Sequence, residues 1–181
     1  MEIQYLGDYS FRIKTKKAIL VTDPQKKTFA DIVAISDREN SKINPALVRG
    51  TKRRPQPFVL PGPGEYEISG VSILGRRWGK TIIHIIETDE LRLVHLGSLR
   101  RKLSEEELEE VNGVDVVFVP AEAGEVVFQI EPKIAIPMGE KSPADFLKTL
   151  GAEETKPLSS LIITSKNLPE ERQVVVLNAR S

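Results

Sequence analysis

The sequence contains no cysteine, only two histidines and a single tryptophan among its 181 residues. The absence of cysteine excludes disulfide bonds, thiolate metal ligands and a cysteine nucleophile. A catalytic zinc ion takes about three protein ligands, usually histidine with a carboxylate, and leaves one position for activated water. The two histidines, His84 and His95, therefore cannot form a histidine-rich zinc centre by themselves.

The chain also lacks an excess of charge of either sign and has few aromatic residues. Its 26 basic residues balance 26 acidic ones, so the net charge gives no reason to expect an anionic membrane or a nucleic acid as a partner. Lys52, Arg53 and Arg54 form a basic cluster, but with 6% aromatic residues the chain has few side chains for base stacking. Nucleic acid is therefore a disfavoured partner.

No segment of the sequence predicts export or membrane insertion. The N-terminal segment, residues 1–14, alternates apolar and polar side chains and lacks the apolar core of a signal peptide. No later run reaches the ~20 apolar residues of a transmembrane helix. With 40% hydrophobic and 29% charged residues, the composition is that of a globular protein, which we expect to be cytoplasmic and not bound to a membrane.

Alternating and short apolar segments predict a chain rich in strands, with a few helices. One helix begins at Ser104, where Glu107 completes a capping box, and ends near Gly113. Another begins at Ser142, before a proline, and ends at Gly151. The predicted strand regions are residues 2–22, 31–35, 58–74, 81–95, 114–119, 133–137, 161–164 and 173–177.

This order of elements predicts one domain of the α/β (α+β) class over residues 1–181. The domain divides into two half-domains, roughly residues 1–80 and 81–178, because strands followed by helices occur in each half. Periodicity alone supports a mixed α/β domain and no finer architecture.

Several short motifs resemble one known family when they are taken in order. The chain resembles the metallo-β-lactamase superfamily, and most closely its branch of ascorbate-6-phosphate lactonase-like zinc hydrolases. The resemblance implies a four-layer α/β/β/α sandwich, here trimmed. The motifs are Tyr5-Leu6-Gly7, Asp23-Pro24, Pro63 to Val71, His95-Leu96-Gly97-Ser98-Leu99 and Ile130 to Met138.

The departures from the family pattern fall on its metal ligands. The buried strand at residues 31–35 runs into a polar loop, residues 36–42, where the family has its His-x-His-x-Asp-His motif. None of the usual ligands is present, so the resemblance implies a degenerate member with no metal, no cofactor and no catalytic residue. The former ligand positions hold Asp37, Glu39, Ser41, Lys42, Ser98 and Gly139.

Basic residues gather in the segments that would surround the lost metal. Fixed positive charge in place of zinc would suit a phosphate or carboxylate, through forked hydrogen bonds. Alternatively, these are solvated surface charges paired with nearby glutamates. The candidate anion-binding residues are Lys42, Arg76, Arg77, Arg100 and Arg101.

Three further side chains have two interpretations each. The resemblance places Trp78 in a loop that is shorter than in the family. There Trp78 either stacks on a ligand at the pocket or folds back onto the core. His95 matches a family position beside the metal, so it lines the pocket or braces the turn at Gly97. His84 lies in an apolar strand, where a structural hydrogen bond is a more common role than metal binding.

These observations favour a non-catalytic binding or interaction module, for which a small anionic ligand is one candidate. The alternative is a metal-dependent hydrolase of a lactone or phosphoester with a substituted site, in which Asp37 and Glu39 hold a hard cation. The segment at residues 121–130 is too short for the helix usual in the family, and uncovered apolar surface would favour a protein partner or a homo-oligomer.

Overall fold

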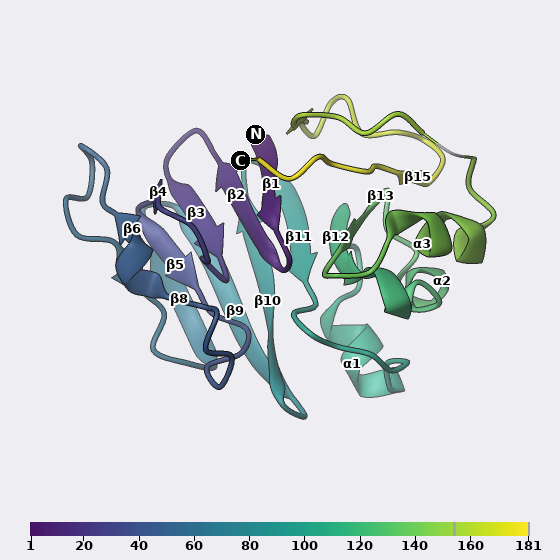
Figure 1. Ribbon diagram of the computed structural model, residues 1–181, viewed down its shortest axis with the longest axis horizontal. Helices are drawn as coiled ribbons and strands as arrows, with labels where there is room; N and C mark the ends of the chain where they lie inside the picture. The colour runs from purple at the N-terminus through teal and green to yellow at the C-terminus, as the bar shows by residue number, and fades with distance from the viewer. Residues whose placement is uncertain (154, 181) are drawn as a thin grey trace.

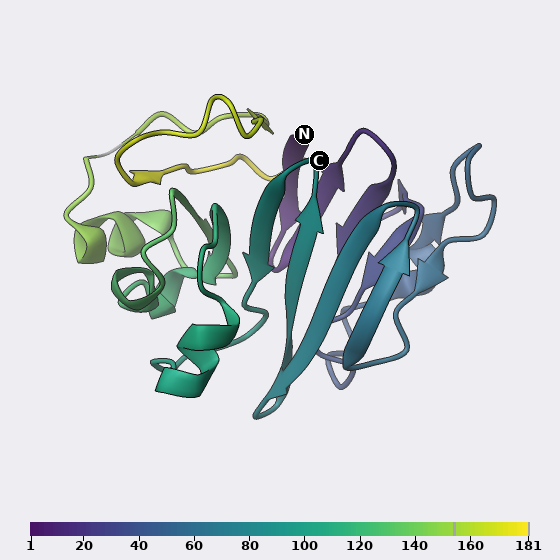
Figure 2. The same cartoon turned by 180° about the vertical axis from the view of Figure 1, so that it is seen from behind.

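The computed structural model describes residues 1–153 and 155–180, in which two β-sheets pack face to face (Figures 1 and 2). The first sheet has the order β14 (Leu161–Ile162), β1 (Glu2–Gly7), β2 (Ser10–Lys14), β3 (Ile19–Thr22), β5 (Ile32–Ala34) and β7 (Phe58–Val59). The second has the order β15 (Gln173–Val174), β13 (Ile134–Met138), β12 (Val116–Pro120), β11 (Leu91–His95), β10 (Thr81–Thr88), β9 (Val71–Trp78) and β8 (Gly64–Ile68). The chain passes from the first sheet to the second between Val59 and Gly64, and it later returns to the first sheet at β14 and to the second at β15.

The main hydrophobic core lies between the two sheets. Alternation along each strand places one set of side chains on the inner face, and the rings of Phe11 and Phe118 meet there at 4.4 Å between centroids. β10 pairs antiparallel with β11, so that His84 lies opposite His95 in this core. β11, β12 and β13 then run parallel, and all side chains of β12 and β13 are buried, as their apolar sequences predict.

The outer layers of the sandwich are unequal. Three short helices, α1 (Glu105–Glu110), α2 (Val126–Ile130) and α3 (Pro143–Leu150), gather at the β12 and β13 side of the molecule in both views. A 3-10 helix, η2 (Ala121–Ala123), precedes α2. The first sheet is covered by no α-helix among the described residues; η1 (Pro45–Leu47) and a two-stranded sheet of β4 (Thr28–Phe29) and β6 (Val48–Arg49) lie in that part of the chain instead. The α+β sandwich is confirmed, with its outer layer thinned on this side.

Local sequence signals explain where the helices begin and end. The Ser104 hydroxyl accepts a hydrogen bond from the Glu107 amide, and the Glu107 carboxylate accepts one from the Ser104 amide. This reciprocal pair confirms the predicted capping box. Ser142 caps α3, and Gly151 ends it in a left-handed conformation. Between η2 and β13 the chain forms only the five-residue helix α2, so the short segment does contain a helix, though a minimal one.

The prediction of a loop between Leu74 and Thr81 is wrong. β9 continues to Trp78, and a two-residue turn at Gly79 and Lys80 joins it directly to β10. Trp78 is only 7% exposed and is part of the protein's large hydrophobic cluster, so it is not available to stack on a ligand. The shortening that removes the family's loop therefore extends a hairpin.

No helix of the described chain is long and apolar enough to cross a membrane.

Candidate functional site at the rim of the sandwich

The former ligand positions lie where several strands end. Asp37, Glu39, Ser41 and Lys42 follow β5, Ser98 follows β11, and Gly139 follows β13. The carboxyl ends of these strands lie at one rim of the sandwich, which is the usual place for a ligand site in layered α/β proteins. In Figure 1 this rim is the lower edge, where the loop after β5 approaches the β9–β10 hairpin.

The turn between β1 and β2 closes the centre of the rim. The amide of Gly139 donates a hydrogen bond to the carbonyl of Asp8 at 2.6 Å. The hydroxyl of Tyr5 donates to the same carbonyl at 2.9 Å. A Cβ at Gly139 would lie 3.4 Å from the Tyr9 hydroxyl, so Tyr9 covers the backbone where the family has its last ligand. The two sheets are thus joined by direct hydrogen bonds at this point.

His95 is held as a neutral brace behind this turn. Its Nδ1 accepts a hydrogen bond from the Gly97 amide at 3.2 Å, so its Nε2 carries the proton and donates to the Tyr9 carbonyl at 2.8 Å. The side chain is fully buried, and burial lowers the pKa of His95 to about 4. The predicted bracing of the Gly97 turn is confirmed, whereas His95 does not line an open pocket.

His84 lies beside His95 without a comparable set of partners. The two ring centroids are 6.5 Å apart. His84 is buried, its Nδ1 has no hydrogen-bond partner, and burial lowers the pKa of His84 to about 3, with the neighbouring His95 adding to the shift. The expected structural hydrogen bond is therefore absent at Nδ1.

A buried carboxyl fixes the start of the loop after β5. Asp23 is fully buried and accepts hydrogen bonds from the amide and the hydroxyl of Ser36. Burial outweighs these bonds and raises the pKa of Asp23 to about 7. The carbonyl of Ser36 in turn accepts from the Ile82 amide at 2.8 Å, and Thr81 Oγ1 accepts from the Ser98 amide at 3.2 Å. This chain of bonds ties the loop to β10 and to the turn after β11.

Most of the predicted anion-binding cations are paired with glutamates. The bonds are Lys42 to Glu140 at 2.6 Å, Arg100 to Glu122 at 2.9 Å, Arg101 to Glu107 at 2.6 Å and Arg76 to Glu110 at 3.4 Å. Arg100 also reaches the hydroxyl of Tyr9 at 3.5 Å. Paired, exposed charges of this kind are the solvated-surface alternative, so these four residues do not form the single cationic site that was expected.

Arg76 and Arg77 lie on opposite faces of β9. Arg76 pairs in register with Ile83, whereas Arg77 pairs with Ile82, and successive residues of a strand point to opposite sides. Arg76 therefore faces outward, beside Glu65 and Glu110, and its assignment to the rim is wrong. Arg77 alone of these two faces the rim.

A hollow of about 300 Å³ lies between the loop after β5 and the β9–β10 hairpin. It contains two former ligand positions, Asp37 and Glu39. Neither Arg77 nor Lys80 makes an ion pair with any residue that the structure describes. The lining residues are Ser36, Asp37, Arg38, Glu39, Arg77, Gly79, Lys80 and Ile82.

Arg38 and Lys80 also line this hollow, although they were not among the candidate anion-binding residues. Arg38 follows the buried strand and donates from its guanidinium to the Leu60 carbonyl, which holds it at the hollow. Lys80 is half of the tight turn after Trp78, a position visible only once the hairpin is recognised. Two carboxylates against three cations leave the hollow with a charge of +1.

Comparison with known proteins identifies the family. A family model described as a β-lactamase superfamily domain matches residues 2–139. The chain belongs to this superfamily. None of the curated proteins searched matches the sequence.

Three solved structures illustrate how far the superfamily fold is conserved. A protein from Thermotoga maritima, described provisionally as a zinc-dependent hydrolase of the metallo-β-lactamase superfamily, is 29% identical, with 98% of both chains covered and a TM-score of 0.82. A metallo hydrolase from Ignicoccus hospitalis is 16% identical, with 90% of this chain and 99% of that chain covered and a TM-score of 0.62. An isothiocyanate hydrolase from Delia radicum gut bacteria is 7% identical, with 91% and 100% covered and a TM-score of 0.67. The metallo-β-lactamase fold is confirmed, and the lactonase-like branch remains a prediction.

The superfamily implies a metal centre at this rim, but the side chains present do not fit one. Among residues 1–153 and 155–180, no group of three or more histidine, aspartate or glutamate side chains could hold a metal ion. Both ring nitrogens of His95 are already hydrogen-bonded to the backbone. Lys42 places an ammonium group at a ligand position and bonds to Glu140. Asp37 directs Oδ1 to the Glu39 amide at 2.9 Å, which leaves a poor donor set.

Proposed function

We infer that the protein is a non-catalytic binding module built on the metallo-β-lactamase fold without a functional metal centre. The observation that carries this proposal is the set of residues at the former ligand positions and the bonds that these residues make. Lys42 bonds to Glu140, Gly139 donates to the backbone of the β1–β2 turn, and Ser98 donates its amide to Thr81. These three positions therefore offer an ammonium group, a residue without a side chain and a hydroxyl, none of which is a usual zinc ligand.

The ligand we assign to the module is a small anion bearing phosphate or carboxylate groups. Arg77 and Lys80 extend from the tip of one hairpin into a hollow of about 300 Å³, which lies at the lower end of the usual range for ligand pockets. Arginine binds such groups through two parallel hydrogen bonds, and lysine adds a point charge. The loop after β5 supplies the opposite wall, which carries Arg38 as a third cation together with Asp37 and Glu39.

The rival proposal is a metal-dependent hydrolase of a lactone or phosphoester with a substituted site. It draws support from the description of the Thermotoga protein as a zinc-dependent hydrolase. Among the described residues that line the hollow, Asp37 and Glu39 are the only carboxylates, and they share it with three cations, which compete with a metal ion for their oxygens. The donor set therefore favours the binding module.

Inorganic phosphate, pyrophosphate and citrate are expected to stabilise the protein in a thermal-shift assay at constant ionic strength. A ligand at about ten times its Kd stabilises the folded state by about 1.4 kcal/mol, which corresponds to roughly 3–5 °C for a chain of this size. In an Arg77→Ala/Lys80→Ala variant the rise should disappear. The matched control is Lys148→Ala/Lys156→Ala, which removes the same charge from exposed positions outside the hollow.

Equal temperature shifts in the parent and in the Arg77→Ala/Lys80→Ala variant would rule out this site. A rise lost in both double variants would mean that the anions act on net charge and not on the hollow.

A further inference from the structure

A second group of cations lies at the opposite end of the strands, away from the rim. Lys14 ends β2, Lys16 and Lys17 lie in the turn that follows it, and the segment between β6 and β7 carries Lys52 and Arg53. All five side chains are exposed. β3 and β5 begin at this end and run toward the rim, so the two ends are separated by the length of the sheet. We call these five residues the basic end.

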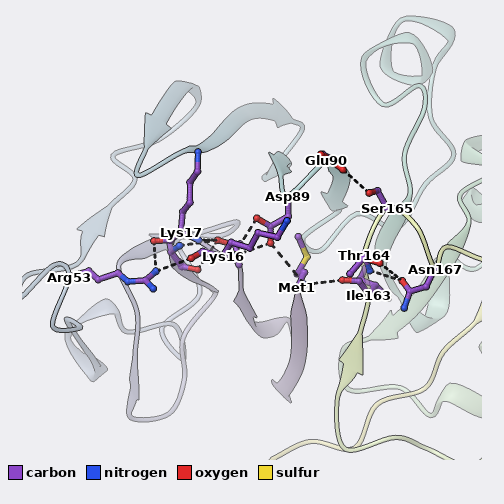
Figure 3. Close-up of polar contacts among 12 residues, drawn as sticks. Met1, Lys16, Lys17, Arg53, Asp89, Glu90, Ile163, Thr164, Ser165 and Asn167 are labelled. Carbon is purple, nitrogen blue, oxygen red and sulfur yellow. Dashed lines mark hydrogen bonds and ion pairs between the residues drawn. The ribbon is translucent and has the colours of Figure 1, made fainter.

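Hydrogen bonds bring the two basic segments together. The guanidinium of Arg53 donates to the carbonyls of Lys16 at 3.3 Å and Lys17 at 2.6 Å (Figure 3). The amide of Arg53 donates to Thr51 Oγ1 at 3.1 Å. A hollow of about 200 Å³ places Lys14 next to Lys52 and Arg53. Two clusters that are 35 residues apart in the sequence therefore form one surface.

No carboxylate in the part of the chain that the structure describes forms an ion pair with these five cations. Asp31 is buried and accepts hydrogen bonds from the Ile19 amide and the Thr51 hydroxyl. Glu90 is exposed and lines a hollow with Lys16, but it makes no ion pair with Lys16 and accepts a hydrogen bond from the Ser165 hydroxyl. Asp89 binds the Lys16 amide at 3.0 Å and lies 4.0 Å from the N-terminal amine (Figure 3).

The cations of the basic end differ from most cations at the rim in having no ion-pair partner among the described residues. At the rim, Lys42, Arg100 and Arg101 each bond to a glutamate, and Arg77 and Lys80 are the cations of the hollow's hairpin that make no ion pair among the described residues. A chain with no net charge has thus concentrated unpaired positive charge at one end. Like charges held close together repel and cost stability, while a concentrated positive field attracts polyanions.

We propose that the basic end binds the phosphate backbone of a nucleic acid without reading its sequence. Backbone binding needs only cations and hydrogen-bond donors spaced along the phosphates, and it releases counterions from the nucleic acid. A protein partner would require an apolar centre in the interface. None of the large exposed apolar side chains of the described chain lies in residues 14–17 or 51–54: they are Phe29, Phe58, Phe128, Leu158 and Ile162.

The few aromatic residues, which disfavour base stacking, do not bear on this mode of binding, because no base is contacted. The convergence of the two segments could not be read from the sequence. Net charge also hides it, since the acidic residues that balance the total lie elsewhere.

Fluorescence anisotropy with a fluorescein-labelled uridine 20-mer tests the proposal on the full chain. Contact with about five phosphates gives a slope of about −3.5 for log K against log salt, so affinity should fall about 100-fold between about 50 and 200 mM KCl. Lys14→Gln/Lys16→Gln/Lys52→Gln should weaken binding at least ten-fold and reduce the slope by about 2. Arg53 is kept, because its guanidinium holds the two segments together.

The control variant is Lys141→Gln/Lys148→Gln/Lys156→Gln, which removes three exposed charges outside the basic end. It should bind as the parent does, and circular dichroism should show both variants folded. Absence of binding at about 50 mM KCl, or equal weakening in both variants, would overturn the proposal. So would displacement of the uridine 20-mer by a glutamate 20-mer as effectively as by unlabelled uridine 20-mer, which would identify an acidic protein as the partner. The site is separate from the Arg77 and Lys80 hollow, so each proposal can fail alone.

Discussion

Replacement of Gly97 by alanine is expected to lower the free energy of unfolding by about 2–5 kcal/mol. Gly97 has a φ of +53°, a left-handed conformation that costs an alanine about 1–2 kcal/mol. A Cβ there would also collide with Thr81 Oγ1 and would lie 2.8 Å from Ser36 Cβ. Overpacking of this kind costs typically 1–3 kcal/mol. Denaturation in urea, followed by circular dichroism, gives the difference.

Gly113→Ala separates the two causes. Gly113 has a φ of +71°, but a Cβ there would meet nothing within 4 Å, so this variant carries the conformational cost without the collision. We expect it to lose about 1–2 kcal/mol. If the two variants lost the same amount, the close packing of Gly97 against Thr81 and Ser36 would be wrong. Equal losses would also contradict the described hydrogen bonds that join the loop after β5 to the turn after β11.

His84→Leu is expected to make the protein less sensitive to acid by about 2 kcal/mol between pH 7 and pH 5. The folded protein holds His84 neutral, with a pKa of about 3, whereas the ordinary value is 6.5. The unfolded chain therefore binds the proton first as pH falls below 6.5, and stability is lost from there down to the folded pKa. At pH 5 the loss is about 1.5 pH units at 1.36 kcal/mol each.

Urea denaturation at both pH values measures this difference. Asp23, with its pKa raised to about 7, acts in the opposite direction, because its protonated form is favoured in the folded state and stability is lost as pH rises through 7. This contribution is common to the parent and the variant, so it cancels in the comparison. At pH 7 the leucine should be tolerated, because the unpartnered Nδ1 is removed together with the ring.

His95→Leu provides the contrast. It should reduce the acid sensitivity by a similar amount, but it also removes the bonds to the Gly97 amide and the Tyr9 carbonyl. It should therefore be destabilised at pH 7, where His84→Leu is not. Identical dependence of stability on pH in the parent and in His84→Leu would contradict the buried, neutral state of His84.

The strands and helix caps could be predicted from the sequence because their signals are local. The capping box at Ser104 lies within four residues, and the continuous apolar sequences of β12 and β13 predict by themselves that these strands are buried. The order of short motifs then predicted the metallo-β-lactamase fold. Each of these signals survives in the structure because no distant contact competes with it.

The state of the rim could not be predicted, because it depends on pairs that are far apart in the chain. Lys42 and Glu140 are separated by 98 positions, and neither suggests the other in the sequence. Arg76 and Arg77 differ only in which side of β9 they occupy, so their roles diverge once the hairpin register is fixed. The resemblance placed Trp78 in a loop, because the family has one there. In the structure the shortened segment instead continues β9 and pairs with β10 up to Trp78.

Metal content is the most direct test of the claim that the superfamily's metal centre has been replaced. Untagged protein would be incubated with zinc, manganese and iron, desalted, and analysed by plasma mass spectrometry, with Asp37→Ala/Glu39→Ala as the control for binding at the rim. The replaced rim predicts less than about a tenth of an equivalent of any metal in the parent, since about three suitable ligands are needed. One equivalent or more in the parent, lost in the control, would show that the rim binds a metal and would favour the hydrolase.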